Sequence, residues 1–185
     1  MVIPDVRHHL LLSDEDYAQI VSIFLFAYAV MYAVSGYVVD RLGTRKGFAV
    51  FISTWSLAEI LHGFAKGKWS LAFYRFLLGL AEPGNFPAAT KAIAEWFPAD
   101  QRGIGVGIFN AGSSLGAAVA PPVAAFLTLH YGWRSAFVFT GGLGLIWLVL
   151  YCRPRFWRRW RLLPDWPSPQ LLSSFLATAY GLPTC

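Results

Sequence analysis

Two charged residues inside a long, mostly apolar run set the strongest limit on how this chain can fold. The run extends from Phe73 to Phe97 and contains Arg75 and Glu82. A charged side chain near the centre of a membrane-spanning helix costs about 2.5 to 3.5 kcal/mol on insertion scales, so such residues usually face the interior of a helix bundle and have a function there. The alternative is structural: Arg75 extends toward the membrane interface, and Glu82 is neutral or paired.

The spacing of the two charges places them on one face of a helix. Arg75 and Glu82 are seven residues apart, and a rise of about 1.5 Å per residue separates their Cα atoms by roughly 10.5 Å. Counted from Trp69 as an interfacial anchor, Glu82 lies about 19 Å deep, near the middle of a hydrocarbon core about 30 Å thick. Pro83 and Pro87 follow, and prolines bend spanning helices next to cavities. The two charges therefore indicate a site for a ligand or a proton.

The composition places this helix face in a membrane protein. The 185 residues are 56% hydrophobic and 14% charged, and the mean hydropathy is +0.50. The net charge of +5 does not indicate a nucleic-acid partner, because Lys and Arg stand at the ends of apolar runs and form no basic face. The two cysteines, Cys152 and Cys185, form no spaced metal-ligand set and no disulfide framework. We expect no metal and no cofactor.

Five apolar runs predict an all-α membrane protein with five transmembrane helices and no sheet, because a segment that crosses lipid must satisfy its own backbone hydrogen bonds. The predicted spans cover about residues 16–38, 47–65, 69–97, 103–129 and 135–152, after a polar lead over residues 1–16. Ser13 and Asp16 form a capping box ahead of the first span. Residues 1–152 are thus predicted as the membrane domain, and residues 153–185 as a basic and then irregular tail.

The basic residues predict the orientation of these helices in an inner or plasma membrane, since Lys and Arg of short loops accumulate on the cytoplasmic side. One side carries nine of them: Arg41, Arg45, Lys46, Arg102, Arg153, Arg155, Arg158, Arg159 and Arg161. The other side carries four: Arg7, Lys66, Lys68 and Arg134. This orientation puts the N-terminus outside, and with five spans it predicts that a further span precedes Met1.

The link between the first two predicted spans carries a specific motif. It reads Gly36-Tyr-Val-Val-Asp40-Arg41-Leu-Gly43-Thr-Arg45-Lys46. It resembles the loop signature G-x-x-x-D-R-x-G-x-R-K, which lies between the second and third helices of the major facilitator superfamily. Glycines permit a tight turn, and the charges can form a network that holds one face of a bundle closed until the bundle rocks. With two later charges that match this network in the family, the candidate gating residues are Gly36, Asp40, Arg41, Gly43, Arg45, Lys46, Glu95 and Arg102.

The central run and two later segments resemble the hexuronate and related sugar-acid transporters of the anion:cation symporter branch. The segments read RFLLGLAEPGNFPAATKAIAEWFP, GIFNAGSSLGAAVAPP and GWRSAF. The resemblance implies that the five spans are helices two to six of the family's fold. It also implies that Arg75 binds the anionic substrate and that Glu82 carries the coupled proton. The other candidate substrate-binding residues are Tyr28, Asn85 and Asn110, and no residue is assigned to catalysis.

Departures from the family pattern bear on function. Glu59, with His62 one turn on, is an acid where the branch generally has a small apolar residue, and we interpret it as packing or local pairing. The segment from Gly107 to Ala125 matches the antiporter signature only in part, because the later glycines of the signature are alanines here. This partial match favours symport over antiport. The comparison with the family predicts that residues 1–152 are a partial N-terminal six-helix half whose first helix is missing or incomplete, that the central loop and the second half are absent, and that the tail over residues 153–185 lies outside the family.

Two functions of different class follow from these residues. The first is part of a proton-coupled symporter for a small organic anion, a hexuronate or related sugar acid, whose partners are the anion, protons, the lipid bilayer and the missing C-terminal half. The second is a non-transporting, truncated membrane fragment. An enzyme is not indicated, because no metal-ligand set, nucleophile motif or phosphate-binding loop rises above chance in the sequence.

Overall fold

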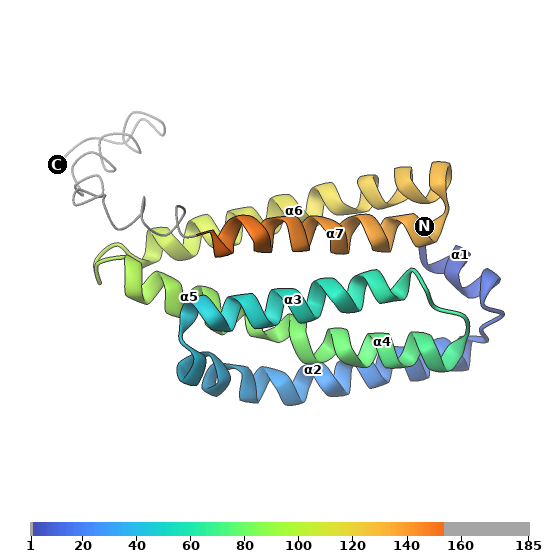
Figure 1. Cartoon of the computed structure of the whole chain (residues 1–185), viewed down its shortest axis with the longest axis horizontal. Helices are drawn as coiled ribbons and strands as arrows, with labels where there is room; N and C mark the ends of the chain where they lie inside the picture. Colours follow the sequence, from blue (N-terminus) through green and yellow to red (C-terminus); the bar gives the residue numbers. More distant parts are fainter. Residues whose placement is uncertain (1, 154–185) are drawn as a thin grey trace. The chain divides into compact units, whose positions relative to one another are not determined.

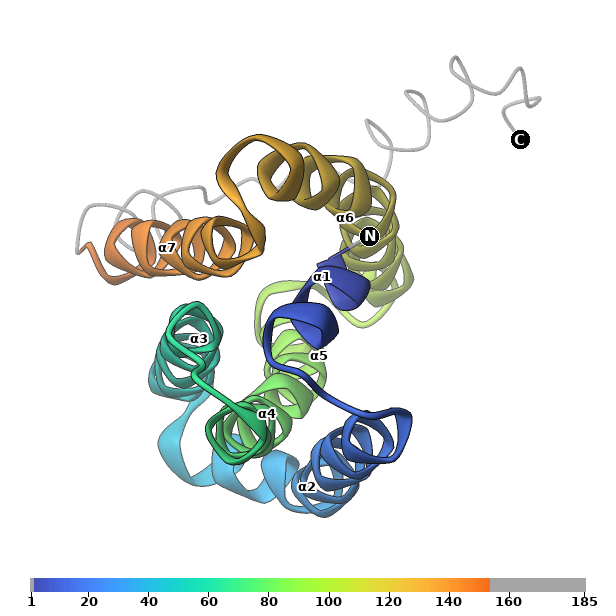
Figure 2. The same cartoon turned by 90° about the vertical axis from the view of Figure 1, so that its right-hand side faces the viewer.

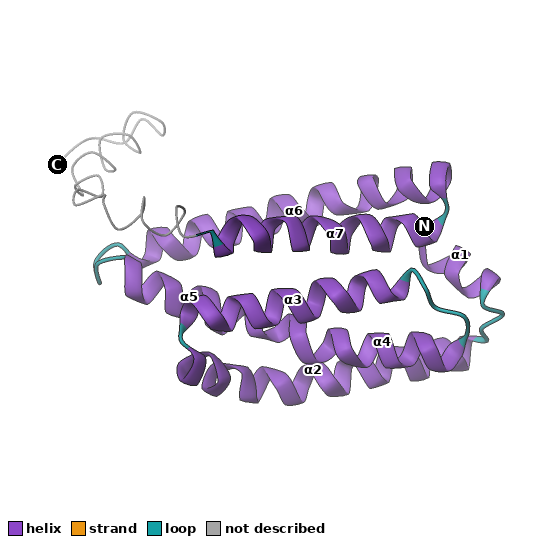
Figure 3. Ribbon diagram, viewed as in Figure 1, coloured by secondary structure: helices purple, strands orange, loops and turns teal. Residues whose placement is uncertain are grey.

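The computed structural model describes residues 2–153, and the regular structure in this part of the chain is helical (Figure 1 and Figure 3). The helices are α1 (Val2–His9), α2 (Asp14–Leu42), α3 (Thr44–His62), α4 (Lys68–Ala81), the short 3₁₀ helix η1 (Glu82–Gly84), α5 (Asn85–Trp96), α6 (Arg102–Tyr131) and α7 (Trp133–Cys152). The prediction of an all-α protein is confirmed for these residues. Met1–Val149 form one compact unit, to which the following description applies. The predicted tail lies, apart from Arg153, outside the described residues.

The capping box predicted at Ser13 begins α2. The Asp16 backbone N–H donates to the Ser13 hydroxyl over 3.1 Å, and the Ser13 backbone N–H donates to the Asp16 carboxylate over 3.2 Å. The helix ends at Gly43, whose φ of +76° lies in the left-handed region that favours glycine, and α3 begins at the next residue. The motif glycine therefore makes the tight hairpin between α2 and α3.

The run predicted as one span over residues 69–97 is divided near its middle. α4 ends at Ala81, η1 follows, and α5 begins at Asn85. Pro83 stands in the first turn of η1, where its missing N–H removes no helical hydrogen bond. Gly84 packs against α3, because a Cβ at this position would lie 2.3 Å from Cγ of Phe51. The division therefore brings the middle of the run into close contact with α3.

Three helices of the described chain are long and apolar enough to cross a membrane, namely α2, α6 and α7. The 19 residues of α3 include Arg45, Lys46 and Glu59, and the third run is split into pieces of 14, 3 and 12 residues. The remaining two predicted spans are also helical. They differ from α2, α6 and α7 because α3 carries these three charges and because the third run is divided into short pieces. Length and composition thus support three of the five predicted crossings.

The structure adds a helix, α1, within the segment that the sequence suggests is a polar lead. Figure 1 and Figure 2 place α1 at one end of the long helices. Its Val6 is buried in an apolar cluster with Leu12, Ile20, Ala65, Leu71, Ala72 and Trp133. Helices this short are marginal in isolation, so the packing of Val6 accounts for the extra helix. The sequence does not predict this helix, because eight residues are too few to show a helical pattern and because the helix depends on contacts with residues far along the chain.

α2 and α4 pack at backbone distance around Gly79. A Cβ at this position would lie 2.6 Å from the Phe24 carbonyl oxygen and 2.9 Å from Cβ of Ala27. Small residues let membrane helices approach closely, and here the contact holds together the two helices that bring Tyr28 and Arg75 to the same region.

We expect Gly79→Val to force these helices apart and to lower the free energy of unfolding by about 3 kcal/mol, the upper part of the range for overpacked cores. The measurement is thermal unfolding in detergent, followed by the helical circular dichroism signal. Gly142→Val is the matched control, because a Cβ at Gly142 meets no atom within 4 Å. Equal melting temperatures for the two variants would contradict the close α2–α4 packing.

Candidate functional site

Arg75 lies on α4 and Glu82 is the first residue of η1, and both side chains are half-buried. Arg75 acts electrostatically on the Glu82 carboxylate. Within the described residues, however, no ion pair of 4.0 Å or less joins the two side chains. The charges therefore lie in one region without neutralising each other by direct contact, as their seven-residue spacing predicts.

A second acid lies near the same guanidinium. Glu59 of α3 interacts electrostatically with both Arg75 and Glu82. Its Oε1 also lies 3.4 Å from Oγ1 of Thr140, which belongs to α7. The sequence gives one signal for this residue, a lone acid within an apolar run, but a helix pattern alone does not show that it shares a site with Arg75. The site thus contains one cation and two acids.

His62, one turn after Glu59, is fully buried beside this charge cluster. Its Nδ1 lies 2.6 Å from the Ala58 carbonyl oxygen, which makes Nδ1 the protonated nitrogen. The ring stacks on Phe137 with centroids 5.4 Å apart and lies 6.0 Å from the Tyr74 ring. Nε2 has no hydrogen-bond partner in the part of the chain that the structure describes. If Nε2 also carried a proton, that N–H would be buried without an acceptor. We therefore interpret His62 as a neutral imidazole that packs beside the charge cluster.

The structure brings one of the three other candidate substrate-binding residues to the charge cluster. Tyr28 of α2 interacts electrostatically with Glu82, and its ring stacks on Tyr32 with centroids 6.2 Å apart. Asn85 is half-buried as the first residue of α5, and Asn110 is exposed on α6. No polar contact among residues 2–153 joins either asparagine to the cluster. Roles for Tyr28, Asn85 and Asn110 remain predictions.

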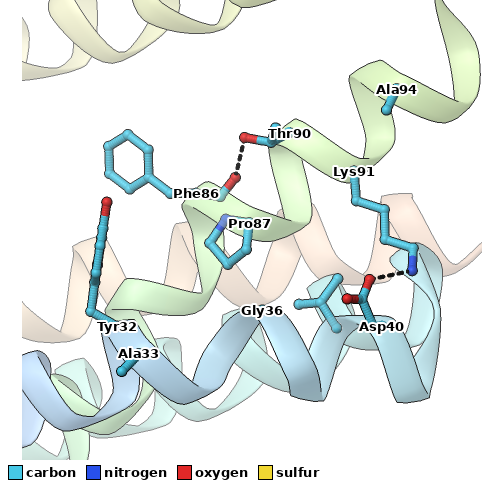
Figure 4. Close-up of a pocket in the computed structure, with 10 residues that line it drawn as sticks. Tyr32, Ala33, Gly36, Asp40, Phe86, Pro87, Thr90, Lys91 and Ala94 are labelled. Carbon is cyan, nitrogen blue, oxygen red and sulfur yellow. Dashed lines mark hydrogen bonds and ion pairs between the residues drawn. The ribbon is translucent and has the colours of Figure 1, made fainter.

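The candidate gating residue Asp40 pairs with a lysine that the motif does not include. Lys91 Nζ lies 2.7 Å from Asp40 Oδ1 and joins α5 to the end of α2 (Figure 4). The pair borders a pocket of about 530 Å³ between these two helices, which Gly36 and Thr90 also line. The Asp40 side chain is 74% exposed, so the pair is open to solvent. Lys91 is the residue that sequence reasoning missed, because it lies inside the third apolar run, in its C-terminal part, and not in a loop.

The other gating candidates lie at the same end of the helices, at the left of Figure 1. The Arg41 guanidinium lies 4.8 Å from the centroid of the Tyr37 ring. Arg102 donates from Nη2 to the Ala94 carbonyl oxygen over 3.2 Å, which links α6 to the end of α5. The remaining ones are Arg45 and Lys46 in the first turn of α3, Glu95 exposed near the end of α5, and the hairpin glycine Gly43.

At the opposite end of α2, an ion pair joins α2 to the start of α4. Lys68 Nζ lies 2.6 Å from Asp16 Oδ1 and donates to Oε1 of Gln19 over 2.7 Å. Together with the Asp40–Lys91 pair, this bond ties the two ends of α2 to α4 and α5, the helices on either side of η1.

The described part of the chain contains three helices long and apolar enough to cross a membrane, and half-buried charges lie within its other apolar runs. The chain is an integral, multi-pass membrane protein. Its sequence matches the family model of the Major Facilitator Superfamily over residues 1–178, and the chain belongs to this family.

Relatives of the chain are named as transporters. It is 41% identical over 157 residues to the hexuronate transporter of Escherichia coli K12, which covers 82% of this chain and 36% of that protein. It is 38% identical over 148 residues to the galacturonate transporter of Dickeya chrysanthemi, covering 80% of this chain and 43% of that protein. A probable sulfoacetate transporter of Cupriavidus necator is 36% identical over 148 residues, which is 80% of this chain and 34% of the relative. The chain thus spans less than half the length of these relatives.

Proposed function

We propose that this chain is part of a proton-coupled symporter for a small organic anion, a hexuronate or a related sugar acid. The observation that carries the proposal is the charge cluster, in which Arg75 faces two acids without a direct ion pair to either. A guanidinium presents a planar fork that matches a carboxylate with two hydrogen bonds. A carboxylic acid near the middle of the bilayer can bind and release a proton during a transport cycle. The names of the relatives, which transport hexuronate and galacturonate, support the substrate class.

We propose five membrane crossings, corresponding to helices two to six of the family's fold, within residues 1–152. At about 1.5 Å per residue, the 19 residues of α3 are about 28 Å long, and the 29 residues from α4 to α5 extend about 43 Å along the chain. The third run is longer than a hydrocarbon core about 30 Å thick. α3 is slightly shorter than the core, a mismatch that local thinning of the bilayer and extension of Arg45 and Lys46 to the headgroups can accommodate. The family's first helix and C-terminal half would complete the substrate cavity.

The proposed function is tested with a chimera, in which residues 1–152 replace the matching segment of the E. coli hexuronate transporter. We expect proteoliposomes with the chimera to accumulate labelled galacturonate when an inward proton gradient is imposed, and to lose accumulation when a protonophore collapses it. The parent transporter is the positive control. A chimera that is inserted and monodisperse but gives no uptake above empty vesicles would contradict the proposal and leave the alternative, a non-transporting fragment.

We propose that the Asp40–Lys91 pair contributes to gating at the cytoplasmic ends of the helices. Exposed ion pairs contribute about 0 to 1 kcal/mol, so the expected effect of Asp40→Asn is a shift of about fivefold or less between inward- and outward-facing states, with expression near normal. The measurement is labelling of a cytoplasmic cysteine probe in the chimera.

A charge exchange makes this prediction specific. We expect Asp40→Lys and Lys91→Asp each to change the labelling rate, and the double variant to return toward the unsubstituted rate, because the pair is restored with reversed sign. Lys66→Gln, an exposed change at the other end of the helices, is the control. Labelling and transport that stay the same in all variants would rule out a gating role.

A further inference from the structure

The pocket between α2 and α5 lies toward the ends of the helices that carry the gating candidates, and the residues of the charge cluster do not line it. Its volume of about 530 Å³ is within the range of ligand pockets. We propose that this pocket is a second, transient binding site for the sugar acid, in which the substrate carboxylate takes Lys91 from Asp40. This inference rests on the proposed function and deepens it.

The pocket continues from the charge cluster along two segments of the chain. On α2, the ring of Tyr32 lines the pocket and stacks on the ring of Tyr28 one turn earlier, with the ring planes at 16°. In the third run, the lining residues Phe86 and Lys91 follow Glu82 by four and nine residues. At about 1.5 Å per residue, Lys91 lies roughly 13.5 Å further along than Glu82. An anion that leaves the charge cluster toward this end of the helices therefore meets the pocket.

Lys91 offers a carboxylate a cation that is easily released from its present partner. An ammonium has three protons to donate, and the polar partner that the structure records for Lys91 within residues 2–153 is Asp40, at 2.7 Å (Figure 4). The Lys91 side chain is 27% exposed and that of Asp40 is 74% exposed, so the lysine is the enclosed member of the pair. A pair with a solvated partner adds little stability. A substrate carboxylate can therefore replace Asp40 at little cost.

The rest of the pocket suits a sugar ring. Figure 4 shows Tyr32 and Phe86 at the opposite end of the pocket from Lys91. Both aromatic side chains are about half exposed, so they offer apolar area to the C–H face of a pyranose. Thr90 Oγ1 donates to the Phe86 carbonyl oxygen over 2.9 Å, and its lone pairs can accept a hydrogen bond from a sugar hydroxyl. Rings, a hydroxyl and a cation together match a sugar with one carboxylate.

Nuclear magnetic resonance of the full chain tests this binding without transport. The sequence contains four lysines, which are Lys46, Lys66, Lys68 and Lys91. A chain labelled with ¹³C at lysine Cε therefore gives few signals, and each is assigned by a Lys→Arg substitution. In phosphatidylcholine nanodiscs, we expect galacturonate to shift the Lys91 signal saturably and to leave the Lys66 signal unchanged. Galactose, which has no carboxylate, should not shift it.

Acetate supplies the carboxylate without the ring. It should shift the Lys91 signal only at concentrations about tenfold higher than galacturonate, because it makes no contact with Tyr32 or Phe86. A Lys91 signal that galacturonate leaves unmoved would overturn the inference. A signal that acetate or galactose shifts as readily as galacturonate would also overturn it.

Two substitutions should change the affinity in opposite directions. Tyr32→Ala should raise the dissociation constant for galacturonate by about three- to tenfold, through the loss of the ring contact. Asp40→Asn should lower it by up to about fivefold, because the competing carboxylate is removed. Tyr131→Ala is the matched control, since Tyr131 is exposed and does not line the pocket. Damage to the fold would weaken binding, so an affinity that does not rise in Asp40→Asn would contradict the exchange of partners.

Substrate protection in the chimera tests whether the pocket is occupied in the complete transporter. In a chimera without other cysteines, Thr90→Cys should react with a thiol reagent, and galacturonate should slow this reaction. Glu95→Cys is the control, because Glu95 is exposed on α5 outside the pocket. Equal slowing at both positions would indicate closure of this end of the helices and overturn the inference. Failure of galacturonate to protect Thr90→Cys would overturn it as well.

The outcomes separate failure of this inference from failure of the proposed function. A chimera that never accumulates galacturonate would refute the function, whereas the Lys91 signal still decides whether the pocket binds a sugar acid. Arg75→Lys should impair uptake and leave the titration of the Lys91 signal unchanged, because Arg75 does not line the pocket. Normal proton-driven uptake, with a Lys91 signal that galacturonate does not move, would refute the second site and leave the function standing.

Discussion

Replacing Glu82 with Gln in the chimera is expected to abolish uphill accumulation of galacturonate while exchange across the membrane continues. A glutamine has the shape and the charge of a protonated glutamate, so the substrate-loaded state of the site is mimicked at every pH. Substrate can then bind and cross in both directions, but no proton is released on the inside to make the return step one-way. The imposed proton gradient should therefore no longer produce a higher concentration inside than outside.

Two measurements on the same vesicles test this prediction. Counterflow, in which unlabelled substrate inside exchanges for labelled substrate outside, should be retained by Glu82→Gln. Accumulation driven by a pH gradient should be lost. Glu15→Gln is the matched control, because Glu15 is exposed in the first turn of α2 and lies outside the charge cluster. Accumulation by Glu82→Gln against a gradient at the wild-type level would show that Glu82 does not carry the proton, and its role would be structural.

The helical fold could be predicted from the sequence because lipid leaves few alternatives. Apolar runs in a bilayer must form helices, so element type followed from composition, and the caps at Ser13 and Gly43 followed from local chemistry. The division at η1 was signalled by Pro83, but its place depends on Gly84 fitting against Phe51. That contact joins residues far apart in the sequence, and no local pattern contains it.

The charges of the candidate site were visible in the sequence, but their partners were not. The motif drew attention to Asp40 together with basic residues next to it, whereas the structure pairs Asp40 with Lys91 from α5. Likewise, Asp16 was read as part of a capping box, and the structure also gives it an ion pair to Lys68 of α4. Both pairs join helices, so they depend on how α2 packs against the third run and not on spacing along one helix.

Glu59 shows the same limit within the membrane. From the sequence, this acid at a position where the related transporters generally have a small apolar residue is interpreted as packing or local pairing. The packing of the helices brings its Oε1 to 3.4 Å from Thr140 Oγ1 of α7, a contact that no local pattern of α3 contains. The spacing of Arg75 and Glu82 could be interpreted directly because both lie in one continuous run, where helix geometry fixes their separation.

Arg75→Lys is expected to raise KM for galacturonate in the chimera by about 10- to 100-fold, the range that corresponds to losing one hydrogen bond to a charged group. Lysine keeps the positive charge but replaces the planar fork of arginine with a single ammonium, which cannot form two parallel hydrogen bonds to a carboxylate. If Arg75 acted only through its charge, for example by balancing Glu59 and Glu82, lysine would serve as well. The substitution therefore separates recognition of the substrate from charge balance.

The matched control for this substitution is Arg134→Lys. Arg134 donates from Nη2 to the Ala65 carbonyl oxygen over 3.3 Å, lies against the Trp133 ring and has no part in the charge cluster. The same chemical change there should leave KM for galacturonate near the unsubstituted value. A further comparison uses an uncharged sugar of similar size as competitor, since it lacks the carboxylate that Arg75 is proposed to bind. Wild-type KM in Arg75→Lys, at normal expression, would assign substrate recognition to another residue and leave Arg75 as the counter-charge of the two acids.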